Sequence, residues 1–430
     1  MQKKLIIKNR IETTDDRPVE YRDAVIDDLK IAVVHDWLIT YGGAERVLEQ
    51  ILSIFPQADL FALYDFTPEG KRGYFLDKQV TTSCLQKFPF ARKKYRSYLP
   101  FMPYAVEQFD LSDYDLIISS SHAVAHGIVT NAEQLHISYI NNTMVYAWDL
   151  YHHYLAGAKL NKGFSGLLAK GIMHYIRMWD AASSHRVDEY IANSRYMARR
   201  INKIYGRESS VIYPPVETDK FSFHAKKDDF YVVVSRLVPF KRIDLIVDAF
   251  NKMPNKNLVI LGDGPDMDKL KARASKNIQF LGFQGRDIVN DFVKRAKAFL
   301  FSSVEPFGIA VVEAHACGTP VIAFGKGAAP EIVTDGENGI LFRKQTPEGL
   351  IEAVERFENE QTSFEPEIIR QNSLRFSTDR FKNQFFDFVR RKVQDRFGSQ
   401  VVNEAVNEIY PSIKNRMAGL ERVNVQKNNV

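Results

Sequence analysis

Residues 305–320 read EPFGIAVVEAHACGTP and follow a short apolar run, Ala298–Phe301. A run of this kind is typical of a buried parallel strand. Pro306 suits the first turn of a helix, and Gly318 suits the end of that helix. The stretch therefore predicts a strand, a turn that holds the first glutamate, and a helix that carries Glu313 about two turns farther on.

The same order of strand, loop and helix occurs in both halves of the chain. The segments are strand 31–34, loop 35–43 and helix 44–52 in the first half, and strand 231–234, loop 235–240 and helix 241–250 in the second. Further apolar runs occur at 116–118, 190–192, 258–261 and 321–324. Strands that alternate with helices predict an α/β protein with two doubly wound parallel sheets.

The domain organisation follows from these patterns. We expect a polar N-terminal extension (1–28), an N-terminal domain (29–213), a C-terminal domain (214–377), a helix (378–397) and a polar tail (398–430). The paired prolines Pro214-Pro215 make a stiff connection between the domains. Ligands of such sheets bind at the carboxyl ends of the strands, so the chemistry is expected in a cleft between the domains.

Composition excludes several classes of protein. The 430 residues are 45% hydrophobic and 26% charged, which argues against disorder, and a net charge of +5 gives little support to nucleic-acid binding. Cys84 and Cys317 do not make a disulfide framework and favour a reducing compartment. We find no apolar run near the roughly 20 residues of a membrane span and no signal-peptide core. The expectation is a cytoplasmic protein.

Two carboxylates stand out in the first stretch. Glu305 lies where the strand ends, and Glu313 lies on the helix, so the two can address opposite ends of one extended polar ligand. Two solvated surface glutamates are the alternative. The flanking Pro-Phe-Gly and Gly-Thr-Pro segments favour a site.

Glu305 and Glu313, with seven residues between them, resemble the Glu-x7-Glu motif of retaining glycosyltransferases of family 4. The resemblance runs from about residue 30 to residue 397, and it implies the GT-B fold of two facing Rossmann-like domains with a C-terminal crossover helix. It also implies that Glu305 is catalytic and binds the donor-sugar hydroxyls near the reacting carbon. Glu313 would bind the nucleotide ribose. Phe307, Gly308 and Ile309 would belong to the same donor site.

The loop Ser235–Lys241 (SRLVPFK) carries two cations five residues apart. A helix N-terminus with an Arg and a Lys is suited to an anion, although two surface bases would also fit the spacing. The stretch looks like the family's Arg-x4-Lys. By that resemblance Arg236 and Lys241 hold the donor diphosphate and act in catalysis by neutralising the leaving group.

Gly42-Gly43 precedes the first helix and allows backbone N–H groups to approach a phosphate. A tight turn explains the pair equally well, but in the family this loop approaches the donor pyrophosphate. Residues 325–331 (GKGAAPE) form a similar loop, in which many family members have adjacent glycines.

His122 follows the strand 116–118 at its expected carboxyl end. Family members often place a histidine there, near the 6-hydroxyl of the donor sugar and the acceptor, which makes His122 a catalytic candidate. His126 lies one turn on and is the alternative. An ordinary surface or core histidine would give the same pattern.

Some motifs are absent. No Gly-x-Gly-x-x-Gly follows Val34 or Val234, and no Walker A sequence occurs, so neither a dinucleotide cofactor nor a P-loop is expected. Asp113-Tyr114-Asp115 precedes a strand and is interpreted as a turn. We therefore expect no cofactor and no essential catalytic metal.

Three further segments indicate the substrate. His35–Leu38 (HDWL), Gly42–Arg46 (GGAER) and Tyr146–Asp149 (YAWD) look most like bacterial enzymes that add mannose from GDP-mannose to lipopolysaccharide or capsule chains. The acceptor would be a polysaccharide or a lipid-linked glycan. A UDP-sugar transferase, a GT-B sugar-nucleotide epimerase and a non-catalytic nucleotide-binding protein are the alternatives. The last is disfavoured because all four charged site residues are present.

Residues 87–104 combine bases and aromatic rings without an acidic residue. Such a segment suits an anionic membrane surface, and we expect it to dock the protein on the cytoplasmic face of the membrane, beside a lipid-linked acceptor. A solvated basic helix or an acceptor groove for an acidic glycan would give the same composition.

Overall fold

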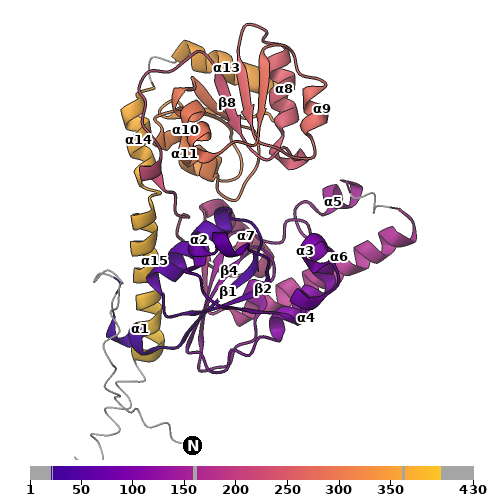
Figure 1. The fold of residues 1–430 in the computed structure, drawn as a ribbon, viewed down its shortest axis with the longest axis vertical. Coiled ribbons are helices and arrows are strands. Elements are labelled where there is room, and N and C mark those ends of the chain that lie inside the picture. Colours follow the sequence, from indigo (N-terminus) through magenta and orange to yellow (C-terminus); the bar gives the residue numbers. More distant parts are fainter. Residues whose placement is uncertain (1–20, 22, 158–161, 361–363, 399–430) are drawn as a thin grey trace, which may run out of the picture.

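The computed structural model describes residues 21, 23–157, 162–360 and 364–398. Two lobes follow one another along the long axis, and each holds a parallel sheet between layers of helices (Figure 1). This is the architecture that the alternating pattern predicts. Most of the N-terminal extension and almost all of the polar tail lie outside the described residues.

The first lobe contains a seven-stranded sheet in the order β3-β2-β1-β4-β5-β6-β7, and its paired strands are parallel. Its strands are β1 Ile31–Leu38, β2 Asp59–Asp65, β3 Val80–Thr82, β4 Leu116–Ser121, β5 Leu135–Ile140, β6 Glu189–Ala192 and β7 Ser210–Val211. The strand order reverses beside β1 and β4. In open parallel sheets this is the edge where ligands bind.

The second lobe contains a six-stranded parallel sheet in the order β10-β9-β8-β11-β12-β13. Its strands are β8 Tyr231–Val234, β9 Leu258–Leu261, β10 Ile278–Gly282, β11 Ala298–Phe301, β12 Val321–Phe324 and β13 Gly339–Phe342. The order reverses between β8 and β11. The loops after these two strands carry Arg236 and Glu305.

Helices cover both sheets. In the first lobe they are α1 Ala24–Asp28, α2 Gly43–Ile54, α3 Ala91–Lys94, α4 Met102–Glu107, α5 Tyr151–Gly157, α6 Gly163–Ser183 and α7 Arg195–Tyr205. The remainder are α8 Ile243–Asn251, α9 Met267–Lys271, α10 Arg286–Arg295, α11 Ile309–Ala316, α12 Ala329–Ile332, α13 Pro347–Glu360, α14 Pro366–Leu374 and α15 Thr378–Val393. Within the described ranges, none of these helices has the length and apolar character needed to cross a bilayer.

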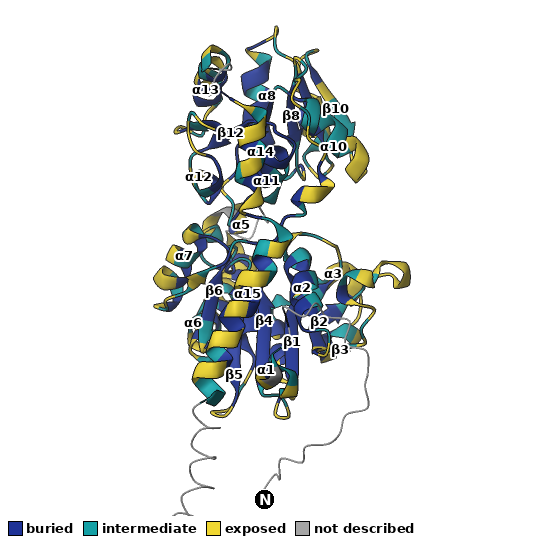
Figure 2. Cartoon of the chain, turned by 90° about the vertical axis from the view of Figure 1, so that its left-hand side faces the viewer, coloured by how far each residue is buried: buried dark blue, intermediate teal, exposed yellow. Residues whose placement is uncertain are grey.

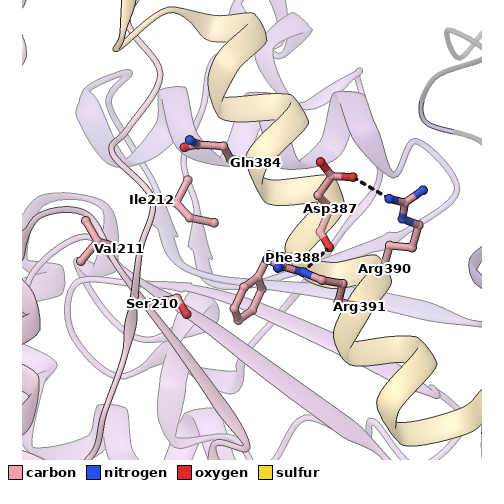
Figure 3. Close-up of a pocket in the computed structure, with 8 residues that line it drawn as sticks. All are labelled: Ser210, Val211, Ile212, Gln384, Asp387, Phe388, Arg390 and Arg391. Carbon is pink, nitrogen blue, oxygen red and sulfur yellow. Dashed lines mark hydrogen bonds and ion pairs between the residues drawn. The ribbon is translucent and has the colours of Figure 1, made fainter.

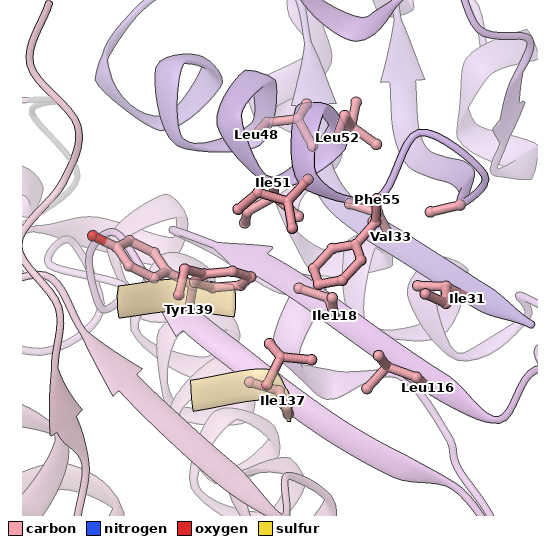
Figure 4. Packing of buried hydrophobic residues seen from close by; sticks show 14 of the residues in the cluster. Ile31, Val33, Leu48, Ile51, Leu52, Phe55, Leu116, Ile118, Ile137 and Tyr139 are labelled. Carbon is pink, nitrogen blue, oxygen red and sulfur yellow. The ribbon is translucent and has the colours of Figure 1, made fainter. Parts of the chain in front are cut away.

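The chain crosses back to the first lobe through α15, as the crossover-helix prediction requires. Its buried Phe381 and Phe385 lie in one apolar cluster with Phe55, the residue that follows α2, and Tyr139 of β5. Figure 4 shows Phe55 and Tyr139 in this cluster. The Phe385 ring lies 6.4 Å from that of Phe55 and 6.4 Å from that of Tyr139. In Figure 2, α15 covers the buried strands with one face and exposes the other.

Part of the predicted extension belongs to this cluster. Tyr21 is buried, its hydroxyl donates to Asn383 Oδ1 (2.7 Å), and its ring meets Phe386 edge-on. Asp23 caps α1, whose Ile26 is fully buried. The polar composition of residues 1–28 therefore conceals a short folded segment.

Three predicted boundaries are wrong. β1 continues through Leu38 because it pairs with β2 as far as Asp65, so the loop does not begin at His35. α8 begins at Ile243, two residues late, because Arg242 adopts a left-handed conformation (φ 55°). α11 begins at Ile309 and not near Pro306, because Gly308 precedes it with φ 131°. Pro306 suggested that the helix begins there, but the helix begins three residues later, after Gly308.

Two buried histidines, one in each lobe, predict sensitivity to acid. Burial lowers the pKa of His136 to about 3 and that of His315 to about 3. In the unfolded chain both bind a proton below about pH 6.5. Since the unfolded state then binds more protons, the free energy of unfolding should decrease as the pH falls from about 6.5 towards 3.

Urea titrations near neutral pH and near pH 4.5 test this prediction. Each histidine should contribute a loss of about 2–3 kcal/mol over that range. His315 Nε2–H donates to Asn338 O (3.1 Å), a bond that His315→Gln can keep without titrating. The Gln variant should show a flatter pH dependence than the wild type, and an equal dependence would contradict the prediction.

Candidate functional site

Glu305 lies in the turn between β11 and α11, where it is bonded to the second predicted cation. Lys241 Nζ donates to Glu305 Oε1 (2.5 Å), and Ser303 Oγ donates to the same oxygen (2.5 Å). The side chains of Lys241 and Glu305 retain 18% and 19% of their exposure. Two residues that lie 64 positions apart therefore share one partly open site.

Glu313 faces the other lobe. Arg46 of α2 donates from Nη1 to Glu313 Oε1 (2.7 Å), and their side chains are 19% and 17% exposed. This ion pair joins the two lobes through α11, the helix that follows the turn with Glu305. Arg46 lies in the quoted GGAER segment, but sequence reasoning gave it no role because its partner is 267 positions away.

The glycine loop of the first lobe meets the start of α11. A Cβ on Gly43 would lie 2.9 Å from Ile309 Cδ1, closer than real Cβ contacts, so the end of the Ile309 side chain would have to shift to admit a larger residue. Gly43 is the first residue of α2, and Ile309 is the first residue of α11. Two helix N-termini thus converge, and each carries partial positive charge and unpaired N–H groups. This junction is suited to an anion.

The Arg236 loop is shaped by two glycines that sequence reasoning did not select. A Cβ on Gly262 (φ 138°) would lie 1.8 Å from Ser235 O, and one on Gly264 (φ 158°) would lie 2.4 Å from Leu237 O. Leu237 N donates to Asp263 O (2.9 Å). The Gly-Asp-Gly sequence after β9 was the signal, and it fixes the backbone on both sides of the exposed Arg236.

The loop 325–331 supports Glu305 from behind. A Cβ on Gly327 (φ 71°) would lie 2.7 Å from Glu305 O, and Ala328 N donates to that carbonyl (3.0 Å). At its end, Glu331 accepts from Arg195 N (2.8 Å) and Tyr196 N (2.7 Å). Of Gly325 and Gly327, it is therefore Gly327 whose close backbone contact requires a glycine. Glu331 caps the N-terminus of α7 in the other lobe.

His122 lies at the carboxyl end of β4 and is positioned by a buried carboxylate. Asp36 accepts backbone hydrogen bonds from His122 N (2.6 Å) and the three residues after it, and it lies 3.1 Å from His122 Nδ1. Burial raises the pKa of Asp36, but the positive charge that His122 carries when it is protonated and these donors outweigh burial and lower that pKa overall. Removal from water lowers the pKa of His122, against the Asp36 charge, so the imidazole is neutral near pH 7.

His126, the alternative candidate, faces the interior. Its Nε2 lies 3.2 Å from Asp180 Oδ1 and its Nδ1 lies 3.2 Å from Ser121 Oγ. Asp180 also accepts from Trp148 Nε1 (2.7 Å) and from Tyr205. The side chain of His126 is 2% exposed, against 22% for His122. A substrate can reach only His122.

Alanine at each position should separate the two histidines. His122→Ala should lower turnover by about one to two decades through loss of a polar contact to the substrate, while four backbone N–H donors still satisfy Asp36. His126→Ala should cost about 3 kcal/mol of stability because Asp180 loses a buried partner. Thermal melts and initial rates on both variants test the assignment. If His122→Ala loses stability but keeps normal turnover, His122 is the structural histidine and the assignment of the two histidines is wrong.

Two hollows lie near these elements. One of about 450 Å³ adjoins the loop that carries the cations and is lined by Phe240, Arg242 and Val304 of the second lobe and Leu150 of the first. The other, of about 470 Å³, lies between β7 and α15, on elements without any predicted site residue (Figure 3). Only the first is placed to extend the cleft.

Metal ligands are not gathered in the part of the chain that the structure describes. No group of three or more His, Cys, Asp or Glu side chains there is arranged to hold a metal ion. Asp113-Tyr114-Asp115 lies in the turn before β4, where the sequence predicts it.

Two family models match the chain, one on each lobe. Residues 41–220 match the family described as Glycosyltransferase Family 4, and residues 216–374 match the family described as Glycosyl transferases group 1. The first match contains Gly42, Gly43 and His122. The second contains both cations and both glutamates.

Individual relatives match over shorter stretches. An uncharacterized glycosyltransferase of Methanocaldococcus jannaschii is 32% identical over 180 residues, 40% of this chain and 51% of that protein. A Mycolicibacterium smegmatis protein named GDP-mannose-dependent alpha-(1-6)-phosphatidylinositol monomannoside mannosyltransferase is 30% identical over 182 residues, 34% of this chain and 47% of that protein. The chain thus spans about half the length of these curated relatives.

The fold has solved counterparts. The crystal structure of Anabaena HepE in complex with UDP matches with a TM-score of 0.62, at 18% identity, and the match covers 84% of this chain and 100% of that chain. At this identity the similarity concerns the fold alone. It identifies the two facing lobes as a GT-B fold.

Proposed function

Because this chain joins a Glycosyltransferase Family 4 domain to a Glycosyl transferases group 1 domain in a GT-B fold, we propose that it is a retaining glycosyltransferase. Its donor is a nucleotide sugar bound between the lobes. The sugar lies at Glu305 and His122, the diphosphate at Arg236 and Lys241, and the ribose at Glu313.

The observation that carries the proposal is that α11 and the turn before it supply the carboxylates of two ion pairs. Lys241–Glu305 lies within the second lobe, and Arg46–Glu313 joins the lobes. The first residues of α2 and α11, Gly43 and Ile309, lie against each other. A nucleotide diphosphate sugar has an anionic centre between two polyhydroxylated ends. Cations at the centre and carboxylates beyond it match that distribution of charge and hydroxyl groups.

Each group has a task in the transfer. Lys241 and Arg236 stabilise negative charge as the nucleotide diphosphate leaves. Glu305 accepts hydrogen bonds from the sugar hydroxyls and holds the reacting carbon in place. A neutral His122 bonds a sugar hydroxyl, and Asp36 holds the backbone that carries it. The bound donor shares Lys241 with Glu305, because an ammonium group has three donors.

Mannose from GDP-mannose is the donor that the proposal names. The HDWL, GGAER and YAWD segments support it, as does the name of the Mycolicibacterium relative. The acceptor would be a bacterial polysaccharide or a lipid-linked glycan. A UDP-sugar is the second candidate, because the HepE structure contains UDP. A sugar-nucleotide epimerase would use the same donor site without an acceptor.

A panel of nucleotide sugars tests the proposal. Calorimetric titration should show that GDP-mannose binds and that GDP competes with it, while UDP-glucose binds more weakly. Slow release of the free sugar from the bound donor should follow. If a UDP-sugar binds more tightly than GDP-mannose, the UDP-sugar becomes the proposed donor. Conversion of the donor to its epimer would identify an epimerase, and no binding of any nucleotide sugar would contradict the proposal.

A further inference from the structure

Helix α6 has apolar residues on two faces. One face is buried in the first lobe and includes Ala169 and Ile176. The other is open, and its apolar side chains recur at helical spacing. They are Phe164, Leu167, Leu168, Tyr175 and Met178, which are 83%, 68%, 57%, 41% and 56% exposed. A helix of a water-soluble lobe normally has a polar outer face. An exposed apolar stripe such as this one on α6 therefore indicates a binding surface.

The segment 87–104 lies beside this helix. Glu107 at the end of α4 accepts from Trp179 Nε1 of α6 (2.9 Å), and Met102 and Ile176 share one apolar core. Figure 1 shows α3, α4 and α6 on the same side of the first lobe. Within the segment, Phe90, Phe101 and Tyr104 are 74%, 53% and 61% exposed.

The charge of this surface has one sign. No acidic residue occurs in 78–106 or in 162–179. Exposed bases lie in both segments, namely Lys87, Arg92, Lys93, Lys94, Arg96, Lys162 and Lys170. We name these bases, with the exposed apolar residues of α6 and of 87–104, the basic–apolar face.

We propose that the basic–apolar face docks on an anionic lipid bilayer, with the Phe164–Leu168 end of α6 inserted among the lipids. Apolar side chains enter the acyl boundary while neighbouring bases contact anionic headgroups. A second copy of the chain would bring the same positive charge to the interface and be repelled. Charge complementarity therefore selects the bilayer.

The face is connected to the cleft by ring contacts. Tyr95 meets Trp37 (ring centroids 5.5 Å apart), and Trp37 meets His122 edge-on (4.5 Å). Docking would thus place the His122 side of the cleft beside a membrane-borne acceptor. The inference itself concerns binding and does not rest on the proposed transferase activity.

Vesicle sedimentation of the full chain tests the proposal with two variants and two matched controls. The variants are F164S/L167S/L168S and R92Q/K93Q/K94Q/R96Q. The controls lie on the second lobe, at exposed apolar positions (I288S/I368S/L374S) and at exposed lysines (K226Q/K271Q/K276Q/K344Q). Each control matches its variant in the number of side chains or charges removed.

The wild type should sediment with vesicles of phosphatidylcholine and phosphatidylglycerol, and not with phosphatidylcholine alone. Both face variants should lose at least about tenfold in partitioning, as should the wild type at high salt. The controls should stay within about twofold of the wild type. Tryptophan placed by L168W should be quenched by brominated lipids, which shows insertion even if the triple variant folds poorly.

Several results would overturn the proposal. The wild type could fail to sediment with anionic vesicles at low salt. The control variants could lose as much partitioning as the face variants. The L168W protein could sediment while the fluorescence of its introduced tryptophan is not quenched. Self-association that F164S/L167S/L168S abolishes, with vesicle binding unchanged, would make a second copy the occupant.

Discussion

Glu305→Ala is expected to lower turnover by about 10²–10³-fold while the affinity for free nucleotide stays within about threefold. Glu305 is assigned to the transferred sugar, so its contacts matter most as the sugar separates from the diphosphate. Glu313→Ala should do the opposite and weaken free nucleotide by about tenfold. Initial rates and nucleotide titrations on both variants measure the two effects.

Two control variants separate the effects of charge and of position in the comparison of Glu305 with Glu313. Glu313→Gln keeps the size of the side chain while it removes the charge that pairs with Arg46. Glu337→Ala removes an exposed carboxylate from the same lobe and should change neither quantity. If Glu305→Ala and Glu313→Ala weaken free nucleotide equally, the two roles are assigned wrongly.

Lys241→Ala is expected to lower donor affinity by about one to two decades with the fold intact, since it removes a charge-assisted contact worth about 1.5–3 kcal/mol. Lys241 also donates to Glu305. The double variant Lys241→Ala with Glu305→Ala should therefore lose less than the sum of the single losses in turnover. Lys271→Ala, at an exposed base of the same lobe, is the matched control. If folded Lys241→Ala binds the donor with unchanged affinity, Lys241 does not bind the diphosphate.

Much of the fold could be predicted from local sequence. The bounds of β8, β9, β11 and β12 agree with the predicted runs, because buried parallel strands are short and wholly apolar. Boundaries set by single dihedral angles were predicted less well. Arg242 takes a left-handed conformation that no propensity favours, and it delays α8. β1 extends through polar His35 and Asp36 because its neighbours pair with it and bury them.

The loops that carry the candidate site residues could be predicted from the sequence, but the contacts between those residues could not. The positions of Glu305 and Lys241 followed from the loops that carry them, yet their ion pair depends on tertiary packing. Arg46 and Asp36 act through partners 267 and 86 positions away, respectively. The open stripe of α6 could not be predicted either, since apolar residues on both faces of a helix do not say which face is buried.

The central claim is that donor sugar reacts at this cleft with retention. Proton NMR of the sugar first released from GDP-mannose, recorded before mutarotation, tests it most directly. The account predicts the α-anomer from the α-linked donor, with release slowed at least tenfold in Glu305→Ala. Release of the β-anomer, or release that Glu305→Ala leaves unchanged, would contradict it.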